Sequence, residues 1–422
     1  MKDQQSTLRG AMKRLDLTRD AFAARLGVSR RALDSWLLPA TSGEFRRMPG
    51  VVAKLLDGLP ATPADGAPGE LRSRFTKRGK PHLLSVAQFD RESVESLLRV
   101  AEAMEPIARR RKVTRVLEGA VLANLFFEPS TRTRVSFGAA FCRLGGAVCD
   151  TTGFTFSSMV KGESIADTSR VVSGYVDAIV VRHPDQGSVA EFARHTHLPV
   201  INGGDGTGEH PTQALLDLYT IRREFERLGK RIDGATVAMV GDLRHGRTVH
   251  SLIRLLSLYK GLHFRLVAPR SLEMPPALVE AAAAAGHEVE QVTSLADGLR
   301  GADVLYATRI QKERMSGEAM EAYPADFRID RRALAAHCRP DTVVMHPLPR
   351  DGTPGANDLS TDLDDDERLA IFRQTDNGIP VRMAVFAVLL GVDHLVARDL
   401  RDAPWIAPSR LGPGDAPFHR LD

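Results

Sequence analysis

The segment FFEPSTRTRVSF, residues 126–137, combines residue types that bind anions at the start of a helix. An apolar run leads into Glu128-Pro129, and the four residues Ser130–Thr133 then open an amphipathic stretch. Hydroxyl groups, backbone amides and a guanidinium at a helix N-terminus form a site suited to phosphate. The alternative is an ordinary Ser/Thr helix cap, and this pattern alone does not decide between the two.

Cationic and amide side chains recur at the ends of apolar runs further along the chain. Arg182 ends the run AIVVR, Arg247 follows TVAMVGD, and Arg309 ends DVLYATR. The other members of the set are Ser157 and Lys161 in SSMVKGES, His210 and Gln213 in EHPTQ, Gln311 in TRIQKER, and Pro347 and Leu348 in HPLPR. Ligands of parallel α/β sheets bind beyond the carboxyl ends of strands, so we expect convergence on a small, multiply anionic ligand.

Strand-like runs alternate with amphipathic helical stretches from about residue 81 onward, which predicts parallel sheets covered by helices on both faces. The apolar runs cover 121–127, 178–182, 198–204, 236–242, 263–269, 303–309 and 342–349. The helical stretches include 91–104, 133–145, 213–229, 278–286 and 379–391. Because this length exceeds what one such core usually holds, we expect an α/β fold of two Rossmann-like lobes with a cleft between them.

The two lobes are predicted to share the C-terminal part of the chain. We assign residues 81–212 to the first lobe, completed by a C-terminal helix at about 378–400, and residues 213–377 to the second. Residues 58–80 are rich in Pro, Gly and Ala and predict a linker. Residues 401–422 contain four prolines and predict an extended tail.

Composition excludes several classes of protein. A chain of 422 residues that is 43% hydrophobic and 26% charged is typical of a globular protein and not of a disordered one. It has a polar N-terminus and no apolar run of about 18 residues, so neither a signal peptide nor a membrane span is expected. Three cysteines without a C-x-x-C pattern argue against a disulfide framework or a cysteine zinc site, and we expect a cytoplasmic protein.

Residues 1–57 stand apart by their charge and their pattern. They hold 11 basic and 6 acidic residues, whereas the whole chain has a net charge of only +4. Thr18 can cap a helix that ends at Gly27, and Ser29 can cap a second helix that stops before Pro39. Two helices joined by a tight turn that contains glycine indicate a helix-turn-helix-like, all-α domain.

This N-terminal segment resembles the helix-turn-helix domains of phage-repressor type. If it binds DNA, Arg30, Arg31 and Ser35 would lie on the helix that faces the groove. The other interpretation, which we prefer, is a small helical module that mediates assembly or regulation.

Seven motifs of the larger part of the chain carry a second resemblance. They are PSTRT, SSMVKGES, VVRHP, HPTQALLDLYTI, VGDLRHGRTVHSL, TRIQKER and MHPLPR, in this order between about residues 80 and 392. In sequence and order they resemble the aspartate carbamoyltransferase family. The resemblance implies transfer of the carbamoyl group of carbamoyl phosphate to L-aspartate, in de novo pyrimidine biosynthesis, without cofactor or metal. It also implies at least a homotrimer with active sites shared between chains.

The resemblance implies a role for each matched residue. Ser130, Thr131, Arg132 and Thr133 would hold the phosphate; Thr133, Arg182 and His210 would polarise the carbamoyl oxygen; Gln213 and the carbonyls of Pro347 and Leu348 would fix the carbamoyl amino group; Arg247, Arg309 and Gln311 would bind aspartate. Ser157 and Lys161 would lie on a loop that reaches into the neighbouring subunit's site, where Lys161 would serve both substrates. Leu348-Pro349 is expected to be a cis peptide.

Two alternatives remain open. One is a carbamoyltransferase for another amine, chiefly ornithine, although that family has a cysteine between His and Leu in the last motif, where this chain has Pro347. The other is a helix-turn-helix regulator whose carbamoyltransferase-like body is inactive and serves as a sensor. For the enzyme we expect direct attack by the aspartate amine, with charge stabilised electrostatically and no covalent intermediate.

Overall fold

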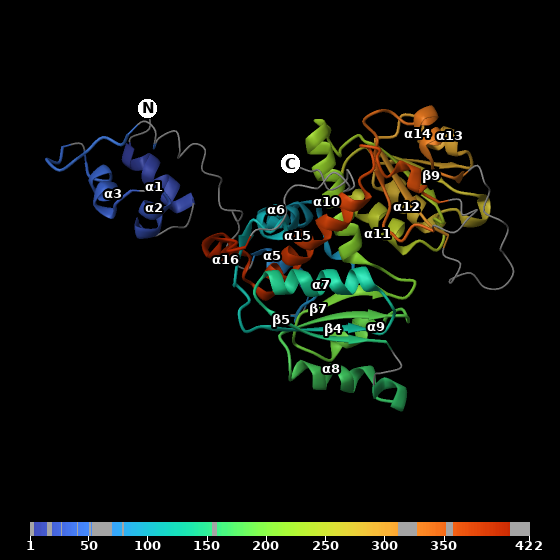
Figure 1. Cartoon of the computed structure of the whole chain (residues 1–422), viewed down its shortest axis with the longest axis horizontal. Coiled ribbons are helices and arrows are strands. Elements are labelled where there is room, and N and C mark those ends of the chain that lie inside the picture. The colour runs from blue at the N-terminus through green and yellow to red at the C-terminus, as the bar shows by residue number, and fades with distance from the viewer. Residues whose placement is uncertain are drawn as a thin grey trace. The chain divides into compact units, whose positions relative to one another are not determined.

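The computed structural model describes residues 4–14, 19–26, 28–39, 41–49, 52, 70–77, 80–153, 158–310, 327–351 and 358–405 (Figure 1). The chain divides into two compact units, Met1–Glu70 and Leu71–Asp422. We refer to them as the N-terminal unit and the main unit, and each is described by itself.

The N-terminal unit is helical, as its sequence pattern predicts. It contains α1 (Gln4–Arg14), α2 (Arg19–Arg25) and α3 (Arg30–Trp36). The Ser29 hydroxyl accepts a hydrogen bond from the Ala32 backbone N–H at 3.2 Å, which confirms Ser29 as the cap of α3. Its buried core consists of Leu8, Ala11, Phe22, Ala23, Leu26, Leu33, Trp36, Leu37 and Val52. The predicted cap Thr18 and terminator Gly27 lie outside the described residues.

The first sheet of the main unit has four parallel strands in the order β5-β4-β6-β7. The strands are β4 (Val121–Phe126), β5 (Ala147–Thr152), β6 (Ala178–His183) and β7 (Val200–Asp205), and the helices are α6 (Arg91–Ala108), α7 (Thr131–Arg143), α8 (Ile165–Ser173) and α9 (Ser188–Arg194). Figure 1 shows α7 and α8 on opposite faces of this sheet. Alternate β4 residues accordingly enter different cores, Leu122 and Phe126 one, Ala123 and Leu125 the other.

The second sheet has five parallel strands in the order β10-β9-β8-β11-β12. The strands are β8 (Thr236–Gly241), β9 (His263–Val267), β10 (Glu288–Val292), β11 (Val304–Thr308) and β12 (Val343–Met345), and the helices are α10 (Pro211–Leu228), α11 (Arg247–Leu256), α12 (Pro276–Ala284), α13 (Leu295–Leu299) and α14 (Arg331–His337). Two parallel sheets covered by helices confirm the predicted α/β class.

The predicted C-terminal helix is longer at its start than the sequence suggested. We expected it at about 378–400, but α15 spans Ile371–Leu390 and ends at Gly391, before α16 (Asp393–Asp399). Gly378 and Pro380 look like helix breakers, yet both lie inside α15. Gly378 is needed there because a Cβ atom would collide with the guanidinium of Arg382 one turn later. Close packing thus overrides the local preference.

The predicted linker at 58–80 is wrong from residue 70 onward. Residues Glu70–Phe75 form α5, and the short strands β1 (Thr76–Lys77) and β2 (Lys80–Pro81) pair antiparallel. Leu71 packs against the main core, which anchors this helix. At the other end, β13 (Arg401–Asp402) pairs with β3 (Lys112–Val113), so the predicted tail begins with a strand. Residues 406–422 lie outside the described part.

Short 3-10 helices complete the described structure: η1 (Val86–Gln88), η3 (Ser158–Lys161), η4 (Arg270–Leu272) and η7 (Thr361–Leu363). Within the described ranges, no single helix is long and apolar enough to cross a membrane. Helices α15 and α16, bent by 114° with respect to each other, pass such a test together, by length and composition only.

Candidate active site

Most of the predicted site residues meet at one cavity of about 880 Å³ in the main unit. Those that line it are Ser130, Thr131, Arg132, Thr133, Arg182, His210, Gln213, Arg247, Arg309, Pro347 and Leu348. Each lies at or just after the carboxyl end of a strand or opens the helix after it, because parallel strands direct their carboxyl ends to the same edge. The predicted convergence is therefore confirmed for these residues.

The start of α7 provides the anion-binding features expected from the PSTRT motif. Ser130 is the N-cap residue, but its hydroxyl forms no capping hydrogen bond, so the ordinary cap interpretation does not hold. Arg132 follows in the first turn and forms no ion pair with any residue that the structure describes. Burial lowers the pKa of its guanidinium, and the nearby charge of Arg309 lowers it further. Two cations near one helix N-terminus favour a bound anion.

Glu128 holds two of the predicted arginines. Its Oε2 lies 3.0 Å from Arg182 Nε and 3.7 Å from Arg247 Nη2. Arg182 Nη1 also donates to the Gly203 carbonyl at 3.2 Å, and Arg247 Nη1 donates to the Gly206 carbonyl at 2.6 Å. Both guanidiniums are buried and face the cavity from different sheets, Arg182 from the end of β6 and Arg247 from the start of α11.

Gly204 makes the close approach of these two arginines to the backbone of β7 feasible. Its φ of +131° lies in a region that residues with a Cβ rarely adopt. A Cβ atom at this position would lie 2.9 Å from Arg182 Nη1 and 3.2 Å from Arg247 Nη2. The glycine therefore leaves the space that the guanidiniums occupy.

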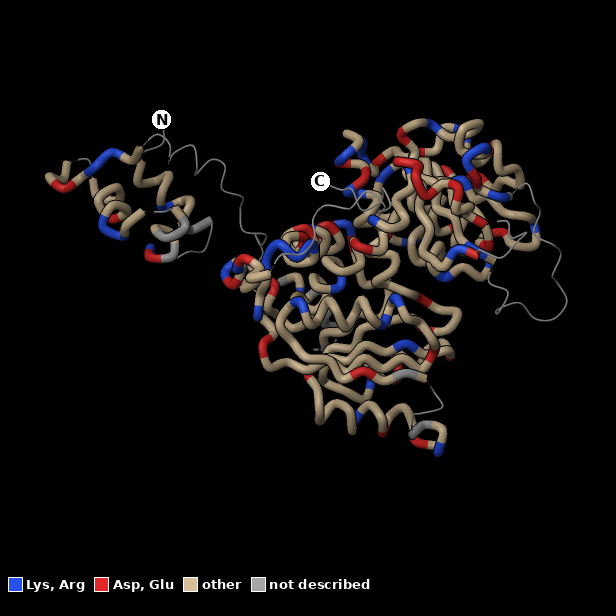
Figure 2. The backbone as a smooth tube through the Cα atoms, viewed as in Figure 1, with Lys and Arg blue, Asp and Glu red and all other residues tan. Residues whose placement is uncertain are grey.

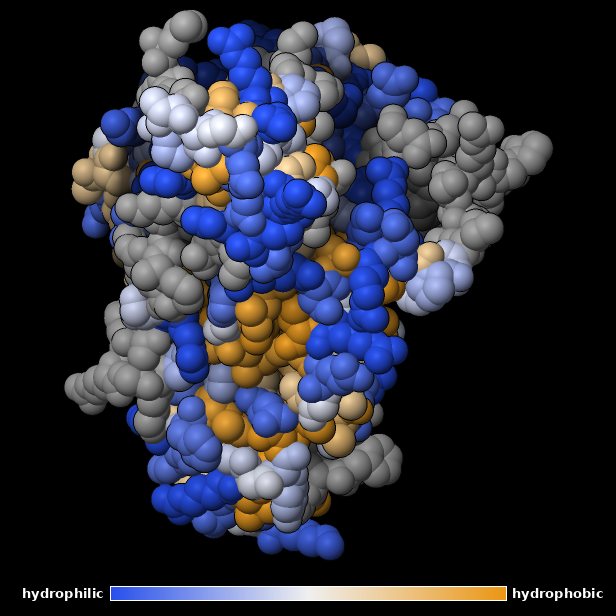
Figure 3. Space-filling view, turned by 90° about the vertical axis from the view of Figure 1, so that its left-hand side faces the viewer, coloured by the Kyte–Doolittle hydropathy of each residue, from blue (hydrophilic) through white to orange (hydrophobic). Residues whose placement is uncertain are grey.

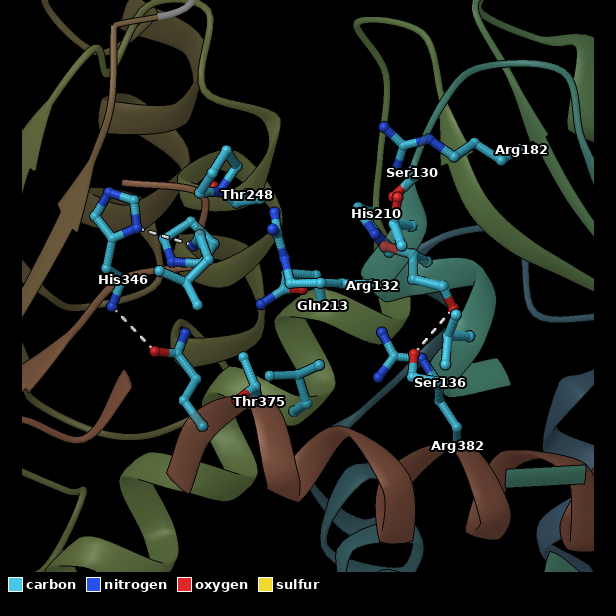
Figure 4. A pocket seen from close by; sticks show the side chains of 18 of the residues that line it. Ser130, Arg132, Ser136, Arg182, His210, Gln213, Thr248, His346, Thr375 and Arg382 are labelled. Carbon is cyan, nitrogen blue, oxygen red and sulfur yellow. Dashed lines mark hydrogen bonds between the residues drawn. The ribbon is translucent and has the colours of Figure 1, made fainter. Parts of the chain in front are cut away.

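His210 enters the cavity from the N-terminus of α10. It is the N-cap residue, and Pro211 takes the first helical position, where a missing N–H costs nothing. His210 is only 4% exposed, and its backbone N–H donates to Ser251 Oγ at 3.4 Å. Figure 4 shows its ring beside Ser130 and Arg132, which suits a hydrogen-bond donor to a bound carbonyl group.

The loop after β12 is held by a hydrogen-bonded histidine. His346 Nδ1 accepts from the Leu348 backbone N–H at 2.9 Å, so the proton of a neutral ring lies on Nε2, which faces Asp358 Oδ1 at 3.1 Å. Burial is the largest single influence on the pKa of Asp358 and raises it, but the hydrogen bond and charge of His346 and the backbone N–H groups of Asp351 and Leu359 together outweigh burial, so the net shift is downward. Leu348-Pro349 is a cis peptide, as expected.

Among the predicted site residues that the structure describes, one does not line this cavity. Lys161, at the end of η3, is exposed to solvent, and its role in a neighbouring subunit stays a prediction. Ser157 and Gln311 lie outside the described residues.

Other cavity residues were missed by sequence reasoning. Thr248, Gln374 and Arg382 line it without having been predicted. Arg382 could have been found from the sequence, because it is a cation within the otherwise apolar second half of α15. In the structure, burial lowers the pKa of its guanidinium to about 10.

Two family descriptions match the chain. Residues 81–223 match "Aspartate/ornithine carbamoyltransferase, carbamoyl-P binding domain", and residues 233–389 match "Aspartate/ornithine carbamoyltransferase, Asp/Orn binding domain". The aspartate carbamoyltransferase catalytic subunit of Dichelobacter nodosus is 57% identical over 341 residues, which cover 81% of this chain and 98% of that protein. This chain belongs to the aspartate/ornithine carbamoyltransferase family.

Solved carbamoyltransferase structures resemble the main unit. Aspartate transcarbamoylase from Trypanosoma cruzi in complex with carbamoyl aspartate and phosphate is 38% identical, with a TM-score of 0.66, and the match covers 76% of this chain and 98% of that chain. The catalytic subunit of M. jannaschii aspartate transcarbamoylase is 41% identical, with a TM-score of 0.66 and coverage of 73% and 97%. The resemblance inferred from the seven motifs is confirmed.

The cavity of this carbamoyltransferase draws on both matched ranges. Residues from the first range include the start of α7 and His210, whereas Arg247, Arg309 and Pro347 come from the second. The predicted lobe boundaries at 212/213 and 377/378 fall inside α10 and α15, helices that pack against each other. Each predicted boundary therefore cuts through a continuous helix and does not mark a break between the lobes.

Proposed function

We propose that the protein transfers the carbamoyl group of carbamoyl phosphate to L-aspartate, forming N-carbamoyl-L-aspartate and phosphate, in de novo pyrimidine biosynthesis. The observation that carries the proposal is the charge of the cavity. Among the described residues, five arginines line it, Arg132, Arg182, Arg247, Arg309 and Arg382, against two acidic residues, Glu128 and Asp376. Such a surplus of cations suits two substrates that together carry a phosphate and two carboxylates.

The same charge balance supports aspartate over ornithine as the acceptor. Ornithine would bring a cationic side chain into a cavity where Glu128 is already engaged by Arg182 and Arg247. Like charges brought together at a partly buried site disfavour binding. Arg247 and Arg309 are instead suited to the two carboxylates of aspartate.

The proposed mechanism needs no covalent intermediate. The aspartate amine attacks the carbamoyl carbon, negative charge develops on the carbonyl oxygen, and phosphate leaves. Thr133, Arg182 and His210 stabilise the oxygen, and the residues at the start of α7 stabilise the phosphate. His210 acts as a donor, and the departing phosphate takes the amine proton. A pH profile of kcat that keeps its shape in His210→Asn supports this role, whereas loss of one limb would assign His210 as the general base.

The direct test is carbamoyl transfer by the purified full-length chain, with carbamoyl phosphate and either L-aspartate or L-ornithine. We expect saturable turnover with aspartate only. Turnover with ornithine alone would overturn the choice of acceptor. An absence of turnover with both would favour the inactive sensor, or an enzyme that needs a second chain.

We further propose a homotrimer with shared sites. Apolar side chains gather in a hollow on the face seen in Figure 3, a surface type that favours protein contacts. Val135 and Tyr175 are 57% and 73% exposed, and Val160 beside Lys161 is 54% exposed. If Lys161 completes a neighbouring site, mixing the inactive variants Lys161→Ala and Arg132→Ala restores part of the activity, because hybrid trimers contain intact sites. Strictly monomeric chains, or no restored activity, would contradict the proposal.

For residues 1–57 we propose a helix-turn-helix-like module that serves assembly or regulation rather than DNA binding. Arg30 forms ion pairs with Asp20 at 2.6 Å and Asp34 at 2.8 Å, and the Ser35 hydroxyl donates to the Ala32 carbonyl. Two of the three side chains expected to face a groove are thus engaged within the unit. Figure 2 shows its basic residues at separate places. Salt-sensitive retention of the full chain on DNA would instead favour the DNA interpretation.

We propose that the protein is cytoplasmic. The thiols of Cys142, Cys149 and Cys338 are free, which supports a reducing compartment.

A further inference from the structure

A fully buried carboxylate lies directly behind the cavity. Asp217, one turn after Gln213 on α10, has no exposed surface. Its Oδ1 accepts hydrogen bonds from Gln213 Nε2 at 2.9 Å and Gln374 Nε2 at 2.6 Å, and its Oδ2 accepts from the Tyr306 hydroxyl at 2.7 Å. These three donors come from α10, α15 and β11, so one side chain links three elements around the site.

The carboxylate determines which way the two amides point. An ionised carboxylate only accepts hydrogen bonds, so both glutamines must turn their NH2 groups toward it. Gln213 then has its carbonyl oxygen left for the cavity that it lines. The carbonyl oxygen of Gln374 accepts from the His346 backbone N–H at 3.0 Å, drawn as a dashed line in Figure 4. Asp217 thereby also fixes the start of the Pro347–Leu348 loop.

We propose that Asp217 is a positioning residue for recognition of the carbamoyl amino group. It orients the Gln213 carbonyl oxygen directly and the backbone carbonyls of Pro347 and Leu348 through Gln374 and His346. A carbamoyl NH2 group has two N–H donors and therefore needs acceptors. If either amide were inverted, a donor would face a donor. This inference rests on the proposed function and deepens it.

Burying the Asp217 carboxylate costs free energy, which indicates that this carboxylate has a role beyond packing. Burial raises the pKa of Asp217 to about 7, although hydrogen bonds from Tyr306, Gln374 and Gln213 work to lower it. Arg382 supplies the favourable charge at a longer range. A buried charge is costly, and an apolar residue of similar size would serve a merely structural purpose better. Above about pH 7 the carboxylate is ionised, accepts from both amides and holds them in one orientation, which accounts for that cost.

The test compares two ligands that differ in the carbamoyl group. The Kd of the full-length protein is measured for carbamoyl phosphate and for inorganic phosphate, in the wild type and in Asp217→Leu. We expect the Kd for carbamoyl phosphate to rise about 5- to 150-fold, the range for leaving buried polar groups unpaired, and the Kd for phosphate to stay within about twofold. The melting temperature should not fall in parallel, since the variant also removes a buried charge.

Two controls separate positioning from a structural role. Tyr306→Phe perturbs the other carboxylate oxygen and leaves the amides in place, so it should bind carbamoyl phosphate like the wild type. Asp217→Asn keeps an acceptor for both amides and should recover most of the affinity. The double variant Asp217→Leu/Gln213→Ala should be no weaker than the worse single variant, because both act on the same recognition. If Asp217→Leu does not fold, Gln374→Met carries the same comparison of ligands.

Several outcomes would overturn the inference. Equal weakening of both ligands would mean a structural role for Asp217, and an unchanged Kd for carbamoyl phosphate would mean no role in recognition. Additive losses in the double variant would separate Asp217 from Gln213. These outcomes differ from failure of the proposed function, in which the wild type itself neither binds carbamoyl phosphate more tightly than phosphate nor turns it over.

Discussion

Replacing Arg132 with methionine separates what this guanidinium contributes to catalysis from what it contributes to stability. Arg132 lies in the first turn of α7, where burial and the charge of Arg309 both lower the pKa of its guanidinium. A lowered pKa of a cation means that the folded protein disfavours the charged form. Near neutral pH Arg132 is protonated in both the folded and the unfolded protein, so its charge lowers the free energy of unfolding over this pH range. We expect Arg132→Met to lose turnover while the ligand-free protein keeps or gains stability.

The two effects differ in size. Removing one donor that stabilises developing charge typically lowers turnover about 100- to 1,000-fold, which corresponds to about 2.7–4 kcal/mol. The gain in stability is smaller, because Arg132 is only partly buried and stays accessible to solvent in the ligand-free cavity, and exposed charge contacts amount to about 0–1 kcal/mol. Turnover should therefore fall steeply while the melting temperature changes little.

The assay combines steady-state kinetics with melting temperatures measured with and without inorganic phosphate. A ligand at 100 times its Kd stabilises the folded state by about 2.7 kcal/mol, so phosphate should raise the melting temperature of the wild type and not of Arg132→Met. Arg134→Met is the matched control, because Arg134 lies on the same helix, pairs with Asp150 at 3.6 Å and does not line the cavity. A variant at 132 that keeps both turnover and the phosphate response would refute the reasoning, as would an equal loss at 134.

Two further predictions follow from the geometry of the site. Gly204→Ala should lower kcat/KM by at least tenfold and the free energy of unfolding by about 1–3 kcal/mol, because the added Cβ displaces the guanidiniums of Arg182 and Arg247. The control is Gly234→Ala, where φ is +82° but nothing lies near the added Cβ, so this variant should lower stability only. Equal losses of kcat/KM in both variants would argue against displacement of the guanidiniums. Asp358→Asn should lower unfolding free energy by about 1–3 kcal/mol at pH 7 in urea titrations. The pKa of Asp358 is depressed in the folded state, so its contribution to the free energy of unfolding is complete above its unfolded pKa of about 3.9 and is lost as the pH falls through its folded pKa. The stabilities of the wild type and Asp358→Asn should therefore converge in acid. A difference in stability that stays constant with pH would contradict this.

Most of the residues that the sequence singled out line one cavity, because they lie at or near strand ends. Arg182 and Arg309 end apolar runs and Arg247 follows one a few residues later, and parallel sheets bring such positions to one edge. The cap at Ser29 was also predicted correctly, because its hydrogen bond joins residues only three positions apart in the sequence. The expected linker failed from residue 70, since its composition does not reveal that Leu71 packs against the main core.

Exposed edge strands were harder to detect than buried strands. The strands β5 and β10 were absent from the predicted runs, and both lie at sheet edges, where AVCDTT and EVEQV carry polar residues exposed to solvent. Central strands such as β6 are buried along their whole length and read as continuous apolar runs.

The sequence by itself determined the α/β class, the order of the motifs and the residue types of an anion site, because these depend on local periodicity and on strand ends. Only the tertiary structure decided that Glu128 holds two arginines, that α15 begins at Ile371, and that Asp217 lies behind Gln213. The physical reason is that these features depend on contacts between residues distant in sequence. Such contacts arise only when α10, α11, α15 and the two sheets pack together, and no local pattern encodes the partner of a buried charge.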